Sequence, residues 1–314
     1  MCAMFNFFRK KRTLGTIIDE YALRQIVKSG EIRDTTKKSK MTSLKMIKLV
    51  SPVTLPIENV KFSEIEDIKD RLLKTNSPAT INRYLAILKQ IFDWSYRMEY
   101  IERTPHIVRC KNYSTKEVDY LNRDQLDVTL KCIQEEINRA PYKAVGQLRT
   151  LWACRIMLYT GIRQRELRLI NWNDIEFGEG YLRVPACAWN KGKERNLKLT
   201  KNAIETFKAM PKFHDTLIDP FATQSFRSLG NRIMWIKQKY SISFVVNPTI
   251  FRKTFCTYAL AYNKLAIQEV CAYMGHSNLQ TTAKYYTNNK AILSSDLDFI
   301  KTLSFNKGRP SKVA

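Results

Sequence analysis

Apolar residues recur at every third or fourth position between Ser77 and Arg97, the spacing that places them on one face of an α-helix. Ser77 is a favourable N-cap residue, and Pro78 suits the first helical turn because no helical hydrogen bond needs its missing N–H. The sequence therefore predicts a helix from Pro78 to about Arg97. Its apolar face consists of Ile81, Tyr84, Leu85, Leu88, Ile91 and Phe92.

Two further amphipathic helices are predicted upstream, over residues 14–27 and 62–73. The basic stretch 37–40 between them shows no clear period. We therefore expect residues 12–110 to form a small all-helical domain, preceded by a basic N-terminal segment at 1–11.

The character of the sequence changes near residue 112. Residues 111–120 are polar and charged, as expected of a linker between domains. Asn122 suits the N-cap of the next helix, and a longer apolar helix is predicted over 145–159. We expect residues 121–290 to form a second domain, followed by a C-terminal segment at 291–314.

Two short strands are predicted over 181–185 and 195–199, with residues 190–193 forming the turn between them. From about residue 200 the pattern returns to helices. The predicted fold is therefore mainly α with a small β-hairpin or sheet.

The charge of the chain points to a polyanionic partner. Its 53 Lys and Arg residues against 29 Asp and Glu give a formal charge of +24 at pH 7. Such an excess is self-repelling unless a polyanion relieves it, and nucleic acid is the usual polyanion. Ribosomal proteins and basic membrane-surface proteins share this property, so charge alone does not settle the class.

The seven cysteines are spread singly, with no Cys-x-x-Cys pair. This pattern argues against a disulfide framework and against a zinc module, and it fits a reducing cytosol. Residues 1–8 are too short for a secretory signal, and no stretch is long and apolar enough to span a bilayer. We expect a cytoplasmic, DNA-associated protein without a membrane partner or metal site.

Five short motifs follow one another in the second half of the chain. They are Thr-Gly-Ile-Arg-Gln-Arg-Glu-Leu at 160–167, Lys-Gly-Lys at 191–193, Ile-Phe-Arg-Lys-Thr at 250–254, Gly-His-Ser at 275–277, and Tyr285. Their order and flanking residues resemble the tyrosine recombinase (phage integrase) family. In addition, Ser-Pro-Ala-Thr-Ile-Asn-Arg-Tyr-Leu at 77–85 and Ile-Phe-Asp-Trp-Ser at 91–95 resemble the core-binding domain of that family.

The resemblance covers roughly residues 60–290. It implies an N-terminal helical core-binding domain and a C-terminal integrase-type catalytic domain that together form a clamp on DNA. It also implies a site-specific DNA recombinase of the kind that mobile elements carry, which needs neither metal, cofactor nor ATP.

A phosphodiester is a poor electrophile, so metal-free chemistry on it requires fixed cations that meet the charge of the transition state. Arginine suits this role because its planar fork donates two hydrogen bonds and stays protonated. The resemblance assigns the role to Arg163 and Arg252, which are far apart in the sequence. Glu166, three residues after Arg163, is expected to orient its guanidinium.

The turn lysine and a histidine complete the cationic set. The resemblance makes Lys191 the general acid for the 5′ oxygen, with Lys193 as its rival and a further DNA contact. It makes His276 a hydrogen-bond donor to a non-bridging phosphate oxygen. His106 and His214 fall outside every motif and are left as surface or structural residues.

Tyr285 is the expected nucleophile, although its neighbour Tyr286 is an alternative. A phenol with a pKa near ~10 attacks well only where cations favour the phenolate. Successive helical side chains point about 100° apart, so only one of the two can face the phosphate. The interval of nine residues from His276 favours Tyr285.

One position departs from the family pattern. The family usually has histidine three residues before the second arginine, where this chain has Thr249. A threonine hydroxyl can hydrogen-bond a phosphate oxygen, but it cannot accept a proton near neutral pH as imidazole does. Lys253, after the arginine, still supplies a cation. We therefore expect altered chemistry rather than an inactive site.

Other basic residues are expected to contact DNA or solvent. Arg83, Lys89 and Arg97 lie away from the apolar stripe of the predicted helix 78–97, where phosphate contact and a solvated charged face are equally good interpretations. In the family, a C-terminal segment docks on a neighbouring protomer, and 291–314 is expected to do so here before ending in a basic tail.

The sequence thus predicts a site-specific recombinase that acts on double-stranded DNA with specific sites. Its expected partners are its own copies, as a tetramer on DNA, and accessory DNA-bending proteins. The alternatives are a non-catalytic DNA-binding relative, which Thr249 favours, and a type IB topoisomerase.

Overall fold

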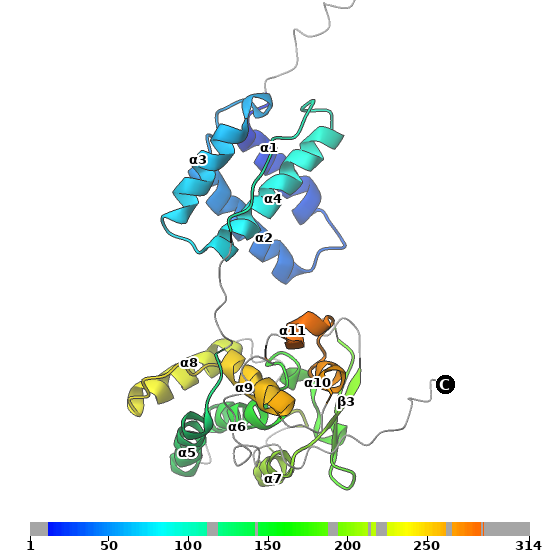
Figure 1. Cartoon of the computed structure of the whole chain (residues 1–314). Coiled ribbons are helices and arrows are strands. Elements are labelled where there is room, and N and C mark those ends of the chain that lie inside the picture. Colours follow the sequence, from blue (N-terminus) through cyan, green and yellow to red (C-terminus); the bar gives the residue numbers. More distant parts are fainter. Residues whose placement is uncertain are drawn as a thin grey trace, which may run out of the picture. The chain divides into compact units, whose positions relative to one another are not determined.

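The computed structural model describes residues 12–111, 119–141, 144–187, 194–212, 215–217, 225–261, 266–283 and 285, without the side chains of 225–228. The chain divides into two compact units, Met1–Thr115 and Lys116–Ala314 (Figure 1). The division falls inside 111–120, the range expected to be a linker. The N-terminal segment 1–11 and the C-terminal segment 291–314 lie outside the described residues.

The first unit is helical. It contains α1 (Leu14–Tyr21), a π-helix (Ala22–Val27), α2 (Asp34–Val50), a 3₁₀ turn (Ile57–Asn59), α3 (Phe62–Leu73) and α4 (Pro78–Arg97). The predicted helices 62–73 and 78–97 are confirmed. The hydroxyl of Ser77 accepts a hydrogen bond from the amide of Thr80 at 3.4 Å, as an N-cap does.

Two details of this unit differ from the prediction. The helix expected over 14–27 changes to a π-helix at Ala22. The basic stretch 37–40 belongs to α2, whose residues Leu44 and Ile47 are buried in the core of the unit. Because α2 contains many lysines and few apolar residues, its short apolar stripe does not stand out in the sequence.

The second unit is built around α6 (Val145–Thr160), which is buried on nearly all sides. Four helices pack against α6, namely α5 (Arg123–Arg139), α7 (Lys201–Ala209), α8 (Ser225–Lys239) and α9 (Pro248–Ala261). Asn122 caps α5 as predicted, accepting the amide of Gln125 at 3.0 Å. Two shorter helices follow, α10 (Ile267–Met274) and α11 (Leu279–Ala283).

A small antiparallel sheet completes this unit, with strand order β1 (Ile175–Glu176), β2 (Tyr181–Val184) and β3 (Arg195–Lys198). Its register pairs Leu182 with Leu197, and both side chains are fully buried. The two predicted strands are confirmed, while the turn at 190–193 lies outside the described residues. The fold is mainly α with a small sheet, as the sequence predicts.

None of the helices in the described part of the chain has both the length and the apolar character that a membrane span requires.

Candidate active site

The side chains of Arg163 and Arg252 meet at the ends of two helices. Arg252, on α9, donates hydrogen bonds to the carbonyl oxygens of Gly161 (2.5 Å) and Met274. Arg163, in the loop after α6, donates to the carbonyl oxygen of Gly275 at 2.6 Å. The last carbonyls of a helix lack partners within it and carry partial negative charge, so they hold guanidinium groups well.

Two glycines shape these helix ends. Gly161 after α6 and Gly275 after α10 adopt left-handed φ angles of 61° and 62°. A Cβ atom on Gly161 would lie 2.5 Å from a ring carbon of Phe255, and one on Gly275 would lie 3.2 Å from Nη1 of Arg163. Glycine at these positions lets the backbone turn sharply and lets the arginines approach it closely.

The buried carboxylate of Glu166 joins two arginines. Its side chain is fully buried, and it accepts the backbone amide and Nη1 of Arg163, both at 3.0 Å. It also receives two parallel hydrogen bonds from Arg195, at 2.9 and 2.8 Å. This is the bidentate geometry that makes an arginine–carboxylate pair strong.

Arg195 is not among the site residues that the sequence predicts. It is the first residue of β3, and its partner Glu166 lies 29 residues earlier. A strand pattern shows that Arg195 stands at a strand end but gives no sign of this long-range contact. Its place directly after the lysine turn is the signal that could have drawn attention to it.

The pKa shifts agree with an ionised cluster. Burial lowers the pKa of Arg252 to about 9, and the charge of Arg163 acts in the same direction, so Arg252 stays protonated at neutral pH. Burial raises the pKa of Glu166, but the hydrogen bonds and charges of Arg195 and Arg163 outweigh it and bring that pKa below its ordinary value. The carboxylate is therefore ionised among the guanidinium groups.

His276 follows Gly275 directly and is held by hydrogen bonds of its ring and of its backbone. Its Nδ1 lies 2.8 Å from the hydroxyl oxygen of Thr282, and its amide donates to the carbonyl of Cys271 at 3.0 Å. Thr282 is fully buried in α11. His276 therefore stands beside the carbonyl of Gly275 that Arg163 binds.

Tyr285 lies at the end of the same segment. It is 8% exposed and packs in the core of the second unit. Its burial raises the pKa of the phenol, the nearby Cys256 thiol acts in the same direction, and the positive charge of Arg252 opposes them. Tyr285 is thus close enough to Arg252 for their charges to interact. Tyr286, Lys191 and Lys193 lie outside the described residues.

The residue that departs from the family pattern is on the surface. Thr249 is exposed in the first turn of α9, three residues before Arg252, and Lys253 is half-buried one position after it. One helical turn separates Thr249 from Arg252, so both belong to the same end of α9.

The three basic residues of α4 are exposed on the first unit. Lys89 pairs with Asp93 at 3.2 Å, Arg97 donates to the carbonyl of Asp93 at 3.3 Å, and Arg83 lies 5.4 Å from the ring centre of Tyr84. The exposed Lys89–Asp93 ion pair contributes little to stability.

Within the described ranges, no three or more His, Cys, Asp and Glu side chains cluster as ligands for a metal ion. Arg163, Arg195 and Arg252 instead give this site a positive charge beside the phenol of Tyr285, which suits an anionic substrate.

Comparisons with known proteins agree on one family. The model of the Phage integrase family matches residues 130–291. A tyrosine recombinase of Thermosipho africanus (strain TCF52B) is 25% identical over 252 residues, covering 76% of this chain and 84% of that protein. Prophage integrase IntR of Escherichia coli (strain K12) is 22% identical over 187 residues, which are 55% of this chain and 42% of that protein.

Solved structures show the same fold. The Tn1549 transposon integrase in complex with transposon right end DNA has a TM-score of 0.71 at 20% identity, covering 87% of this chain and 94% of that one. A lambda integrase tetramer bound to a Holliday junction has a TM-score of 0.70 at 19% identity, covering 91% of this chain and 80% of that one.

Proposed function

The chain belongs to the phage integrase family of tyrosine-type site-specific recombinases, and we propose that it cuts and rejoins DNA strands through a 3′-phosphotyrosyl bond to Tyr285. One observation carries this proposal above the others. Arg163 and Arg252, 89 residues apart in the sequence, direct their guanidinium groups to adjoining carbonyls of Met274 and Gly275.

The arginines would bind the scissile phosphate by exchanging partners. In the structure, carbonyl oxygens accept their hydrogen bonds. A phosphate oxygen carries more negative charge than a carbonyl oxygen and forms charge-assisted hydrogen bonds, so it competes well for the same N–H groups. The pentavalent transition state is more negative still, so the arginines stabilise it more than the bound substrate.

Tyr285 would supply the nucleophile. As the phenol gives its proton to solvent water, its oxygen bonds to phosphorus and the bond to the 5′ oxygen breaks; the leaving oxygen takes up a proton, which leaves a 3′-phosphotyrosyl link and a free 5′ hydroxyl. The 5′ hydroxyl of a second strand then attacks the link and releases Tyr285. Each step exchanges one phosphate ester for another, so the scheme needs neither ATP nor metal.

The remaining site residues have supporting roles in this scheme. Lys191 donates a proton to the leaving 5′ oxygen, with Lys193 as the alternative donor. His276 hydrogen-bonds a non-bridging oxygen, and Thr249 does so with its hydroxyl where the family usually has imidazole. Lys253 adds positive charge near Arg252.

The substrate of this reaction would be double-stranded DNA carrying a specific recombination site. The helical domain 12–110 would bind it through Arg83, Lys89 and Arg97, and the domain 121–290 would carry out the cleavage. Strand exchange requires paired sites and hence several copies of the chain. The lambda integrase of similar fold is a tetramer bound to a Holliday junction. The segment 291–314 would dock these copies, and DNA-bending proteins would act as accessories.

A DNA-binding relative without efficient chemistry is the second candidate. Thr249 favours it, because a hydroxyl cannot take the proton that imidazole would. Thr249 is exposed on α9, so the threonine at this position does not disturb the packing that holds Arg163, Arg252 and Tyr285. The two candidates therefore differ in whether a covalent intermediate forms.

Covalent trapping separates these candidates. The protein is incubated with a nicked suicide duplex built from the direct repeats that flank its gene, and denaturing gels reveal any protein–DNA adduct. An adduct that Tyr285→Phe abolishes and Tyr286→Phe retains supports the recombinase. Tight binding to the same duplex without any adduct favours the DNA-binding relative.

A further inference from the structure

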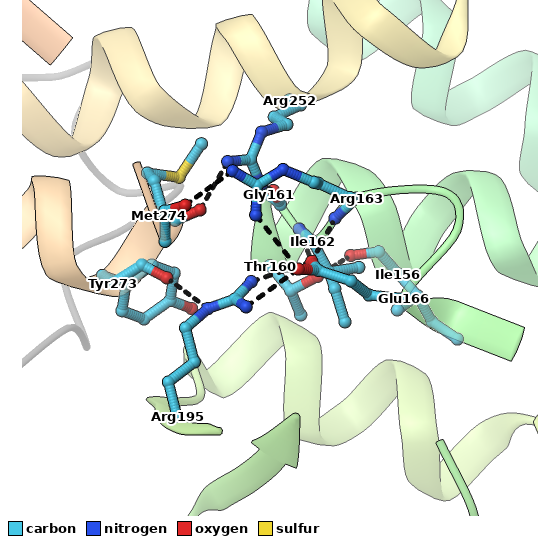
Figure 2. A network of polar contacts seen from close by, with 11 residues as sticks. Ile156, Thr160, Gly161, Ile162, Arg163, Glu166, Arg195, Arg252, Tyr273 and Met274 are labelled. Carbon is cyan, nitrogen blue, oxygen red and sulfur yellow. Dashed lines mark hydrogen bonds and ion pairs between the residues drawn. The ribbon is translucent and has the colours of Figure 1, made fainter. Parts of the chain in front are cut away.

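Arg195 reaches the active site from the sheet and bridges two of its parts. Its Nη1 and Nη2 bind the two carboxylate oxygens of Glu166, and its Nε donates to the carbonyl of Tyr273 at 3.0 Å (Figure 2). Its side chain is only 12% exposed. All three kinds of guanidinium nitrogen are thus engaged, which fixes the orientation of the group.

The charge of Glu166 has to be shared between partners. A buried carboxylate is stable only when it is paired, and Arg163 contacts the same oxygen, Oε1, that Nη1 of Arg195 binds. If Arg163 were its main partner, Glu166 would neutralise the positive charge of Arg163 that would otherwise bind a phosphate. Because Arg195 occupies both carboxylate oxygens, the charge of Arg163 remains available to an anion.

The two guanidinium groups lie close together over Gly275. A Cβ atom on this glycine would be 3.1 Å from Cζ of Arg195 and 3.2 Å from Nη1 of Arg163. Two positive charges this close together repel each other. The carboxylate of Glu166, which both guanidinium groups bind, offsets the repulsion. The position of Arg163 therefore depends on Arg195 through Glu166.

We propose that Arg195 is a positioning residue of the cleavage site, which takes up the charge of Glu166 so that Arg163 keeps its charge and position for the scissile phosphate. The proposal rests on the proposed function. Arg195 also lies four residues after Lys191, the proposed general acid, at the start of β3. Its contact with Glu166 therefore anchors β3 at the phosphate site.

A rescue experiment tests this role. The rate of adduct formation on the suicide duplex is measured in single turnover at saturating protein, with DNA affinity measured separately. Arg195→Met leaves Glu166 with Arg163 alone, and we expect a loss of rate on the order of 100-fold with little change in affinity. Combining it with Glu166→Gln removes the uncompensated charge, so about tenfold or more of the rate should return.

Arg183 provides the matched control. It is an arginine of the same sheet that also pairs with a buried carboxylate, that of Asp174, at 2.9 Å. Arg183→Met should leave the rate within about twofold, as is usual for surface positions away from the site. If Arg195→Met does not fold, Arg195→Gln takes its place in the same comparison.

Two kinetic results would overturn the proposal: a loss of less than about threefold in the Arg195 variant, or a double variant no faster than the single one. If the wild-type protein forms no adduct, the proposed function fails, and the carboxyl ¹³C NMR titration of Glu166 then decides about Arg195. Arg163 and Arg195 bind this carboxyl and the charge of Arg252 acts on it, so Arg195→Met, which removes its bidentate partner, must raise its pKa. An unchanged pKa would refute the role.

Discussion

The Nδ1 atom of His276 lies 2.8 Å from the hydroxyl oxygen of Thr282, whose backbone carbonyl accepts the amide of Tyr285 at 3.0 Å. Thr282 therefore connects the imidazole beside the proposed phosphate site with the turn that carries the proposed nucleophile. Because Thr282 is fully buried, water does not compete for its hydroxyl. This hydrogen bond orients the ring of His276.

Thr282→Val should lower the rate of adduct formation about 5- to 10-fold, the equivalent of one neutral hydrogen bond. Valine has the shape of threonine, so the buried packing is kept while the contact with His276 is lost. Thr282→Ser retains the hydroxyl and should stay within about threefold of the wild-type rate. The pH dependence of the rate is recorded for both variants. Equal losses in the two would show that packing, and not the hydrogen bond, matters here.

Thr249→His should increase the rate of adduct formation by about tenfold or more, because an imidazole can accept and return a proton. Thr249 is exposed in the first turn of α9, so a larger side chain fits without disturbing the core. The pH–rate profile should gain a limb near ~6.5, the ordinary pKa of imidazole. Thr249→Val, which removes the hydroxyl, should be slower than the wild type. An unchanged rate and profile in Thr249→His would contradict the role given to this position.

Gly161→Ala should destabilise the second unit by about 2–4 kcal/mol. The left-handed φ of 61° disfavours any side chain, and the new Cβ atom would clash with Phe255 at 2.5 Å. Gly146→Ala is the control, since nothing lies within 4 Å of its Cβ position in α6, and it should be neutral or stabilising by up to about 1 kcal/mol. Urea unfolding measures both. Equal stabilities of the two variants would refute the strain at Gly161.

Glu136→Gln should lower the free energy of unfolding by about 1–3 kcal/mol at pH 7, because Glu136 accepts hydrogen bonds from Lys239 and Tyr240 at 2.6 and 2.7 Å. Burial raises the pKa of Glu136, but these contacts outweigh it and lower the pKa overall.

A carboxyl with a lowered folded-state pKa stabilises the protein above its unfolded pKa of about 4.3, and this stabilisation fades as the pH falls through the folded value. The difference between wild type and Glu136→Gln in urea unfolding should therefore shrink between about pH 5 and pH 3. A difference that stays constant over this range would show that the charge of Glu136 does not stabilise the fold.

Local signals in the sequence predict much of the fold. Ser77 and Pro78 mark the start of α4, Asn122 marks the start of α5, and alternation marks β2 and β3. Each signal acts within a few residues. The hydrophobic pattern does not reveal α2, because a few apolar residues are enough to hold this helix where a neighbouring helix covers them. It also gives no sign of the change at Ala22, where a regular apolar stripe continues as a π-helix.

The site is predicted less completely. Motifs supply Arg163, Arg252, His276 and Tyr285, but their contacts with the carbonyls at the ends of α6 and α10 depend on tertiary packing. Arg195 was missed for the same reason, since its partner Glu166 lies in a different element. A sequence shows which residues can bind a phosphate, and the fold decides what holds them in place.

The most direct test of the account identifies the residue that becomes linked to DNA. The trapped adduct is digested with nuclease and protease, and tandem mass spectrometry locates the nucleotide on the peptide that contains Tyr285 and Tyr286. The account predicts a 3′-linked nucleotide on Tyr285. A nucleotide on Tyr286 or on any other residue, or a 5′ linkage, would contradict it.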